Sequence, residues 1–92
     1  MTEPVWHLYL LRCGEVLYTG ITTDVEARVQ AHAEGRGAKF TRGRTVELLF
    51  RRAIGSRSRA SRMEAAVKRL SRAGKLAIIR GEAPLPDLPG DS

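Results

Sequence analysis

Two short apolar runs, residues 6–12 and 16–21, stand near the start of the chain with Cys13-Gly14-Glu15 between them. Apolar runs of this length on either side of a turn are typical of a β-hairpin. Gly14 supplies the positive φ that a tight hairpin turn requires. The first run is largely apolar on both faces, which predicts a central strand with packing on each side. We therefore expect the rest of the domain to be arranged around this hairpin.

The residues after the hairpin show the spacing of a helix. Thr23 and Glu26 form a capping-box pattern, which predicts a helix from about residue 24 to residue 34 that ends at Gly35. Within this stretch Arg28 lies one helical turn before His32, on the same side as part of the apolar stripe. A guanidinium and an imidazole should therefore project together.

The second half predicts one strand and two helices. Residues 45–53 alternate in polarity and predict a third strand. Ser56 or Ser58 can cap the next helix, which carries an apolar stripe among many cations. Ser71 can cap a last helix over residues 72–80. The predicted order of elements is therefore ββαβαα, an α+β arrangement.

Length and composition fit one small domain. We expect residues 1–81 to form it and residues 82–92, with three prolines and several acids, to form a flexible acidic tail. The single cysteine, Cys13, excludes an internal disulfide and a Cys-based zinc site, and its apolar context favours a buried structural thiol. No apolar run approaches the roughly 18 residues of a membrane span and no signal peptide is evident, so we expect a cytoplasmic protein.

Positive charge is concentrated in the middle of the chain. Fourteen of the sixteen Lys and Arg residues lie between Arg36 and Arg80, against the acids Glu47 and Glu64. A solubilising face is the simple interpretation, whereas a nucleic-acid backbone is the partner that so basic a block favours. The expected partner is DNA, with RNA as the alternative and no membrane. The residues that we expect to contact it are Arg36, Lys39, Phe40, Arg42, Arg44, Arg62, Lys68 and Arg69.

The candidate chemistry rests on phenols, a cation, an imidazole and a carboxylate. Each strand of the hairpin carries one tyrosine, Tyr9 and Tyr18, and these could share a site with Arg28 and His32. The alternatives are strand tyrosines that pack, a solvated arginine and a core histidine. The acid Glu64 stands alone in the cationic helix and could be a metal ligand or an ordinary i,i+4 partner of Lys68. Taken together, the set fits metal-assisted phosphodiester hydrolysis.

The tyrosine motifs resemble a known family. His7-Leu8-Tyr9 followed by Tyr18-Thr19-Gly20 is similar to the two half-motifs of the GIY-YIG nuclease superfamily. The segment 17–24, the loop 37–44 and the segment 68–72 are similar to its small single-domain bacterial (YhbQ-like) branch. The resemblance covers about residues 6 to 81.

The resemblance implies a fold and a set of roles. The fold is a three-stranded antiparallel sheet flanked by helices. Tyr9 would be the general base or would position water, Tyr18 would assist at the scissile phosphate, and Arg28 would stabilise the phosphorane charge. His32 lies where relatives often carry a histidine or tyrosine near the site, Gly20 would permit close packing, and Glu64 would hold one divalent ion, Mg²⁺ or Mn²⁺.

Some positions depart from the family pattern. His7 and Leu8 replace the glycine and isoleucine of the first half-motif, Thr19 replaces the isoleucine of the second, and the chain contains no asparagine, which some relatives place near the site. Many relatives carry a separate DNA-binding domain; we expect none here, so specificity would come from the basic block or from a protein partner. The leading hypothesis is a structure-directed or weakly specific DNA endonuclease. The alternative is a non-catalytic nucleic-acid-binding module or an interaction module of a repair complex.

Overall fold

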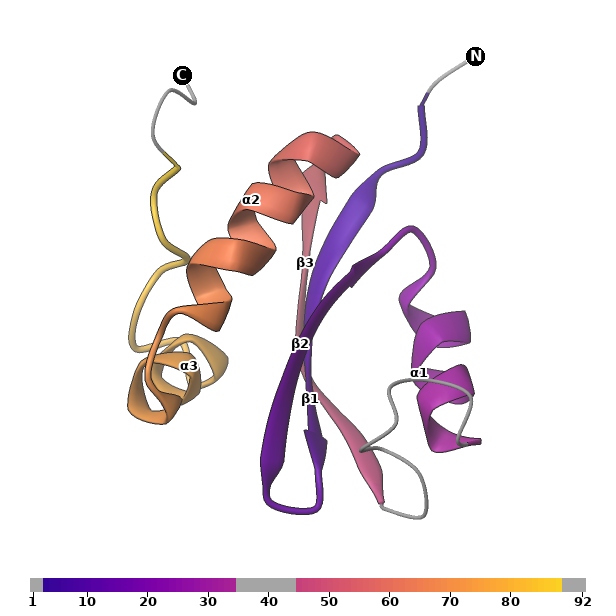
Figure 1. Cartoon of the computed structure of the whole chain (residues 1–92), viewed down its shortest axis with the longest axis vertical. Coiled ribbons are helices and arrows are strands. Elements are labelled where there is room, and N and C mark those ends of the chain that lie inside the picture. The colour runs from indigo at the N-terminus through magenta and orange to yellow at the C-terminus, as the bar shows by residue number, and fades with distance from the viewer. Residues whose placement is uncertain (1–2, 35–44, 89–92) are drawn as a thin grey trace.

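The computed structural model describes residues 3–34 and 45–88, and within them the predicted order of elements is confirmed. The elements are β1 (Trp6–Cys13), β2 (Val16–Thr22), α1 (Val25–Ala33), β3 (Val46–Gly55), α2 (Arg57–Lys68) and α3 (Arg72–Ile79). The strands form an antiparallel sheet in the order β2-β1-β3, and the class is α+β (Figure 1). The predicted loop residues Arg36, Lys39, Phe40, Arg42 and Arg44 lie outside the described residues.

The hairpin turn sets the register of the two strands that carry the tyrosines. Gly14 has a φ of 61°, the left-handed conformation that the sequence predicted for it. Cys13 pairs with Val16 across the turn, and this register places Tyr9 directly opposite Gly20. Since opposed residues of an antiparallel pair share one face, the side chain of Tyr9 lies on the face where Gly20 offers only a hydrogen atom.

The central strand β1 is covered on both faces, as its sequence predicted. On one face Leu8 and Leu10 pack with Met63 and Val67 of α2. On the other face Tyr9, Leu11 and Cys13 pack with Val25 of α1. Figure 1 shows α2 and α3 on one side of the sheet and α1 on the other. The core is therefore two thin layers that share β1.

The first helix begins one residue later than the predicted capping box implies. Its N-cap is Asp24, whose carboxylate accepts the backbone N–H of Ala27 at 3.1 Å, and the capping box built on Thr23 is wrong. A carboxylate at the positive end of a helix gains a charge–dipole interaction that a hydroxyl lacks. The caps of the other two helices are Ser56 and Ser71, as predicted.

Polar contacts fasten the layers together at their edges. Arg51 of β3 forms an ion pair with Glu26 of α1, and Arg72 of α3 donates a hydrogen bond to the backbone carbonyl of Glu15 in the hairpin turn. No helix in the described ranges is long and apolar enough to cross a membrane.

The segment after α3 returns to the body of the domain. Leu85 and Leu88 pack against the apolar cluster that contains Leu8 and Met63. Residues 89–92 lie outside the described residues, so the flexible tail and the boundary at residue 81 stay predictions. Within residues 82–88, the two leucines attach the segment to the core. The prolines and acids of this segment had suggested a tail without such contacts.

Candidate active site

The site begins with a phenol that extends over the neighbouring strand. A Cβ atom built on Gly20 would lie 2.4 Å from Oη and 2.5 Å from Cζ of Tyr9, which is closer than real Cβ atoms approach. The ring of Tyr9 is buried, with 1% of its surface exposed. Gly20 therefore provides the space through which the Tyr9 hydroxyl reaches across β2, the role predicted for this glycine.

Two side chains of α1 converge on that hydroxyl. Nε of Arg28 donates a hydrogen bond to Oη of Tyr9 at 3.4 Å, and Nε2 of His32 lies 3.3 Å from the same oxygen. The ring of Tyr18 stacks edge-on against His32, with 4.9 Å between centroids, and lies 6.2 Å from the Tyr9 ring. The structure thus brings together Tyr9, Tyr18, Arg28 and His32, as the sequence predicted.

The electrostatics of this cluster favour two neutral groups beside one cation. Burial raises the pKa of Tyr9 above its usual value, against the hydrogen bond from Arg28, which lowers it. Burial and the charge of Arg28 lower the pKa of His32 below its usual value. The hydrogen bond to Tyr9 raises the pKa of Arg28. At neutral pH the cluster is therefore a phenol and an imidazole, both uncharged, held next to a guanidinium.

An uncharged imidazole beside a phenol can accept the phenol's proton. His32 is fully buried, and its Nδ1 has no hydrogen-bond partner among the described residues. Among the described residues, the hydroxyl of Tyr9 at Nε2 is therefore the hydrogen-bond partner that bears on which ring nitrogen carries the proton. If Tyr9 gives its proton to Nε2 of His32, the guanidinium of Arg28 is in place to stabilise the resulting phenolate.

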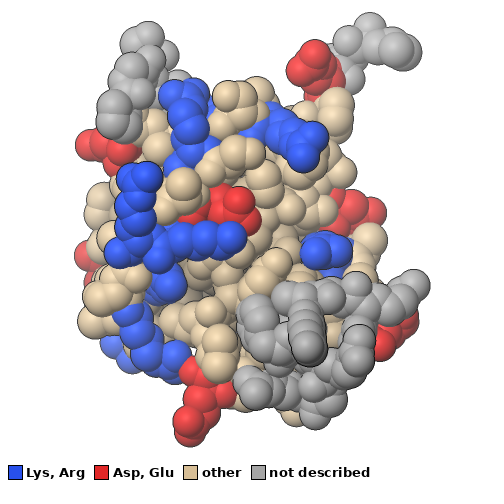
Figure 2. All heavy atoms as spheres, in the orientation of Figure 1, with Lys and Arg blue, Asp and Glu red and all other residues tan. Residues whose placement is uncertain are grey.

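Glu64 lies on α2, the helix that packs on the other face of the sheet from α1 (Figure 1). Its side chain is 24% exposed, and Oε2 forms an ion pair with Nζ of Lys68 at 3.4 Å, one turn along the helix. This is the i,i+4 pairing that the sequence left open as an alternative. Figure 2 shows acidic atoms in the middle of this view with basic groups beside them.

The donor set bears on which metal this chain could hold. Among residues 3–34 and 45–88 no group of three or more His, Cys, Asp or Glu side chains is placed to hold a metal ion. A single carboxylate such as Glu64 fits Mg²⁺, which often keeps several waters and takes one or two protein carboxylates together with substrate phosphates. Such an ion would depend on the substrate for part of its coordination shell.

The basic surface follows α2. The predicted contacts Arg62, Lys68 and Arg69 are all exposed on this helix or at its end, and Figure 2 shows Lys and Arg gathered over the side where α2 and α3 lie. Arg57 and Arg59 lie in the first turn of the same helix, which carries no acid, and the guanidinium of Arg57 lies over the ring of Trp6.

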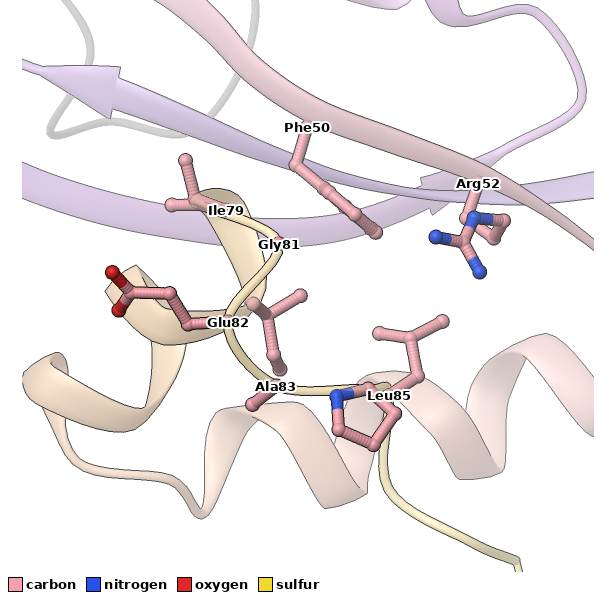
Figure 3. Close-up of a pocket in the computed structure, with 9 residues that line it drawn as sticks. Phe50, Arg52, Ile79, Gly81, Glu82, Ala83 and Leu85 are labelled. Carbon is pink, nitrogen blue, oxygen red and sulfur yellow. The ribbon is translucent and has the colours of Figure 1, made fainter.

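A separate pocket lies on the far side of β1 from the tyrosines. It has a volume of about 470 Å³ and lies between β3 and the segment after α3 (Figure 3). Phe50 points toward Leu85 across it, with Arg52 at one end. No candidate catalytic residue lines this pocket.

Comparison with known proteins agrees with the resemblance drawn from the motifs. The family model described as the GIY-YIG catalytic domain matches residues 5–77. This range contains all five candidate catalytic residues, and it ends before the predicted tail. The match confirms the assignment that the paired tyrosine motifs suggested.

The individual relatives that match this chain are named UPF0213 proteins. A UPF0213 protein of Sodalis glossinidius is 51% identical over 77 residues, which cover 82% of this chain and 72% of that protein. A UPF0213 protein of Serratia proteamaculans is 48% identical over 83 residues, which cover 86% of this chain and 81% of that protein. The solution NMR structure of UPF0213 protein BH0048 from Bacillus halodurans is 41% identical, with a TM-score of 0.55 over 85% of both chains. The likeness to that structure confirms the predicted fold.

Proposed function

The chain belongs to the GIY-YIG catalytic domain family, and on that premise we propose that it is a divalent-metal-dependent endonuclease that hydrolyses DNA phosphodiester bonds. The observation that carries the proposal is the convergence of Arg28 and His32 on the hydroxyl of Tyr9. A tyrosine that only packs in a strand has no need of a buried imidazole and a guanidinium on its oxygen. Cleavage would be structure-directed or weakly sequence-specific.

The proposed reaction assigns the proton transfers to the buried pair. Tyr9 takes a proton from the attacking water as its own proton passes to Nε2 of His32. The water oxygen then bonds to phosphorus, the bond from phosphorus to the leaving ester oxygen breaks, and that oxygen takes a proton from solvent. The raised pKa of Tyr9 favours this relay, because a phenolate formed without an acceptor would be unstable in a buried site.

The guanidinium would act on two oxygens at once. Arg28 has five N–H donors, and the contact with Tyr9 uses the one on Nε. Arg28 also interacts with the Tyr18 side chain, and the rest of its Nη donors would serve the phosphoryl oxygens, where charge builds in the transition state. Tyr18 would position the scissile phosphate beside them.

Glu64 is the proposed ligand of one Mg²⁺ or Mn²⁺ ion. When bound there, the ion would supply Lewis-acid polarisation of the phosphate. The basic residues of α2 and of the loop 35–44 would hold the flanking backbone of the nucleic acid, with DNA the expected substrate and RNA the alternative. A cytoplasmic location, a role in DNA repair and a protein partner that adds specificity complete the proposal.

One observation favours a second candidate function. The ion pair between Glu64 and Lys68 is also what a helix without a catalytic metal would carry. In that case the chain would be a non-catalytic nucleic-acid-binding module, or an interaction module of a repair complex. The two functions differ in whether phosphodiester bonds are broken.

A cleavage assay separates them. The purified chain is incubated with single-stranded, duplex, flapped and branched DNA, and with RNA, in Mg²⁺, Mn²⁺ or EDTA. We expect metal-dependent cleavage that falls at least about 100-fold in Glu64→Gln. The matched control is Glu47→Gln, which removes an exposed acid paired with Arg12 and should cleave normally. Binding without cleavage on every substrate would favour the binding module.

A further inference from the structure

Lys68 and Glu64 form an ion pair whose two members differ in exposure. The Glu64 side chain is 24% exposed and the Lys68 side chain 54%, with 3.4 Å between Nζ and Oε2. We propose that Lys68 is an internal counter-ion that blocks this carboxylate until nucleic-acid phosphates draw the ammonium away, so that nucleic acid and the divalent cation bind cooperatively. This inference rests on the proposed function, since it takes Glu64 as the metal ligand.

The ammonium and a metal ion compete for the same oxygen atoms. A Mg²⁺ ion sits about 2.0–2.1 Å from a carboxylate oxygen and brings its own waters. With Nζ of Lys68 at 3.4 Å from Oε2, the two cations would repel strongly at close range. Because Glu64 is partly buried, solvent screens this repulsion less than it would on an open surface. Metal binding to the free chain should therefore require Lys68 to move.

The surroundings of Glu64 make the free chain a poor metal binder for a second reason. Glu64 is the single acid of α2, which also carries Arg57, Arg59 and Arg62 in addition to Lys68. A divalent cation that approaches this helix meets a net positive field. A bound polyanion reverses that field and also offers phosphate oxygens as further ligands.

Lys68 has the properties of a group that can leave. Its side chain is the more exposed of the pair, and an ion pair across one helical turn is weak compared with the attraction of several phosphates. Once its ammonium pairs with a phosphate, Glu64 is free for the metal. By thermodynamic linkage, the metal must then raise the affinity for nucleic acid by the same factor.

The test measures Mn²⁺ binding and oligonucleotide binding separately. The parent is the full chain with Tyr9→Phe, which prevents cleavage, and Lys68→Gln is added to it. The matched control is Arg69→Gln, which removes the same charge from the next residue. Mn²⁺ binding to protein alone is followed by electron paramagnetic resonance, and oligonucleotide binding by fluorescence anisotropy with Mn²⁺ or with EDTA.

We expect Lys68→Gln to raise the Mn²⁺ affinity of the protein alone about 5-fold, and Arg69→Gln to raise it less than about 2-fold. In the parent, Mn²⁺ should tighten oligonucleotide binding about 10-fold, and in Lys68→Gln only about 2-fold. In EDTA both variants should weaken oligonucleotide binding similarly, since each loses one cation. Circular dichroism checks folding, and Arg28→Lys provides a second cleavage-deficient background.

Two results would overturn the inference. One is an equal Mn²⁺ affinity in the parent and in Lys68→Gln, and the other is undiminished coupling in Lys68→Gln. If the unmutated chain still cleaves DNA in that case, the proposed function stands and Lys68 is a plain backbone contact. If the unmutated chain never cleaves but Mn²⁺ binding depends on Lys68, the proposed function fails and the counter-ion role stands.

Discussion

On the α1 face of the sheet the reactive groups are buried and contact one another, whereas on the α2 face the charged groups are exposed and spread over a helix. Tyr9 and His32 have almost no exposed surface, and their contacts run through one shared oxygen. Lys68 and its neighbours extend from α2 into solvent, where they can change partners.

The two faces therefore act in different ways: the α1 face through the exact placement of buried groups, and the α2 face through the attraction of exposed cations for an anion. Buried polar groups act at short range in a low dielectric, so small displacements there have large consequences. Exposed cations act through a field that salt screens over roughly 8–10 Å, so each of them contributes a modest share. Variants of the first face should therefore change the rate of cleavage, and variants of the second should change affinity and its dependence on salt.

Gly20→Ala is the substitution that we expect to disrupt the α1 face most. The new methyl group would meet the Tyr9 hydroxyl at 2.4 Å, so the ring must leave its place. We expect the free energy of unfolding to fall by about 2–3 kcal/mol and cleavage to fall at least about 100-fold. Urea denaturation and a cleavage assay measure these quantities. In the control Gly74→Ala, the new Cβ would lie 3.3 Å from Leu70 within a helix, and stability should change by less than about 1 kcal/mol.

Arg28→Lys tests the contact with Tyr9 while it keeps the charge. A lysine has no Nε–H in a planar fork, so it cannot hold the phenol oxygen and the phosphate together. We expect single-turnover cleavage to fall about 100-fold with oligonucleotide affinity nearly unchanged. Arg12→Lys, at the exposed ion pair with Glu47, is the control and should cleave at the normal rate. A loss of oligonucleotide affinity equal to the loss of cleavage rate would indicate that Arg28 contributes to binding and not to the cleavage step.

The pH dependence of both stability and cleavage should come from His32. Its pKa in the folded chain is lower than the ordinary value of 6.5, so the unfolded chain binds more protons below that pH. The stability associated with His32 is therefore present above about pH 6.5 and is lost as the pH falls toward the lower folded pKa. Cleavage should decline over the same acid range, because only the neutral ring can accept a proton.

His32→Gln provides the comparison for that profile. We expect it to lower the cleavage rate about 10- to 100-fold and to remove the decline of unfolding free energy that His32 causes below about pH 6.5. Urea titrations at several pH values and a rate–pH profile measure both. An identical acid decline in the variant would assign the titration to another group.

The smallest effects should come from single cations of the α2 face. Arg62→Gln should weaken oligonucleotide binding about 3-fold and reduce the slope of log affinity against log salt by about 1, without a change in the cleavage rate at saturation. Fluorescence anisotropy at several salt concentrations measures the slope. A normal slope would place Arg62 outside the nucleic-acid interface.

The fold was the more predictable part because its signals are local. Apolar residues on both faces of residues 6–12 predicted the central strand, and Gly14 predicted the turn. Cys13 is buried, as its context indicated. The cap of α1 was predicted one residue early, because the capping-box spacing ignores the charge of the competing Asp24.

The site was predicted as a set but not as a geometry. Helical spacing placed Arg28 and His32 on one side of a helix, yet spacing cannot show that both meet a single oxygen of another element. Helical spacing also could not decide whether Glu64 pairs with Lys68 or binds a metal ion. The i,i+4 spacing fits an ion pair, and a lone acid in a cationic helix suggests a metal ligand. Tertiary contacts and the substrate decide such questions, and neither is encoded in a local pattern.

The pairing of Tyr9 with Gly20 depends on the length of the hairpin turn. A strand that slips by one residue turns each of its side chains to the other face, so a single insertion beside Gly14 would present Thr19 or Ile21 to the phenol in place of the glycine. Both half-motifs would remain intact in the sequence. The Tyr9 hydroxyl, however, could no longer reach Arg28 and His32 across Gly20. The length of this turn is therefore as important to the geometry of the candidate site as the candidate side chains themselves.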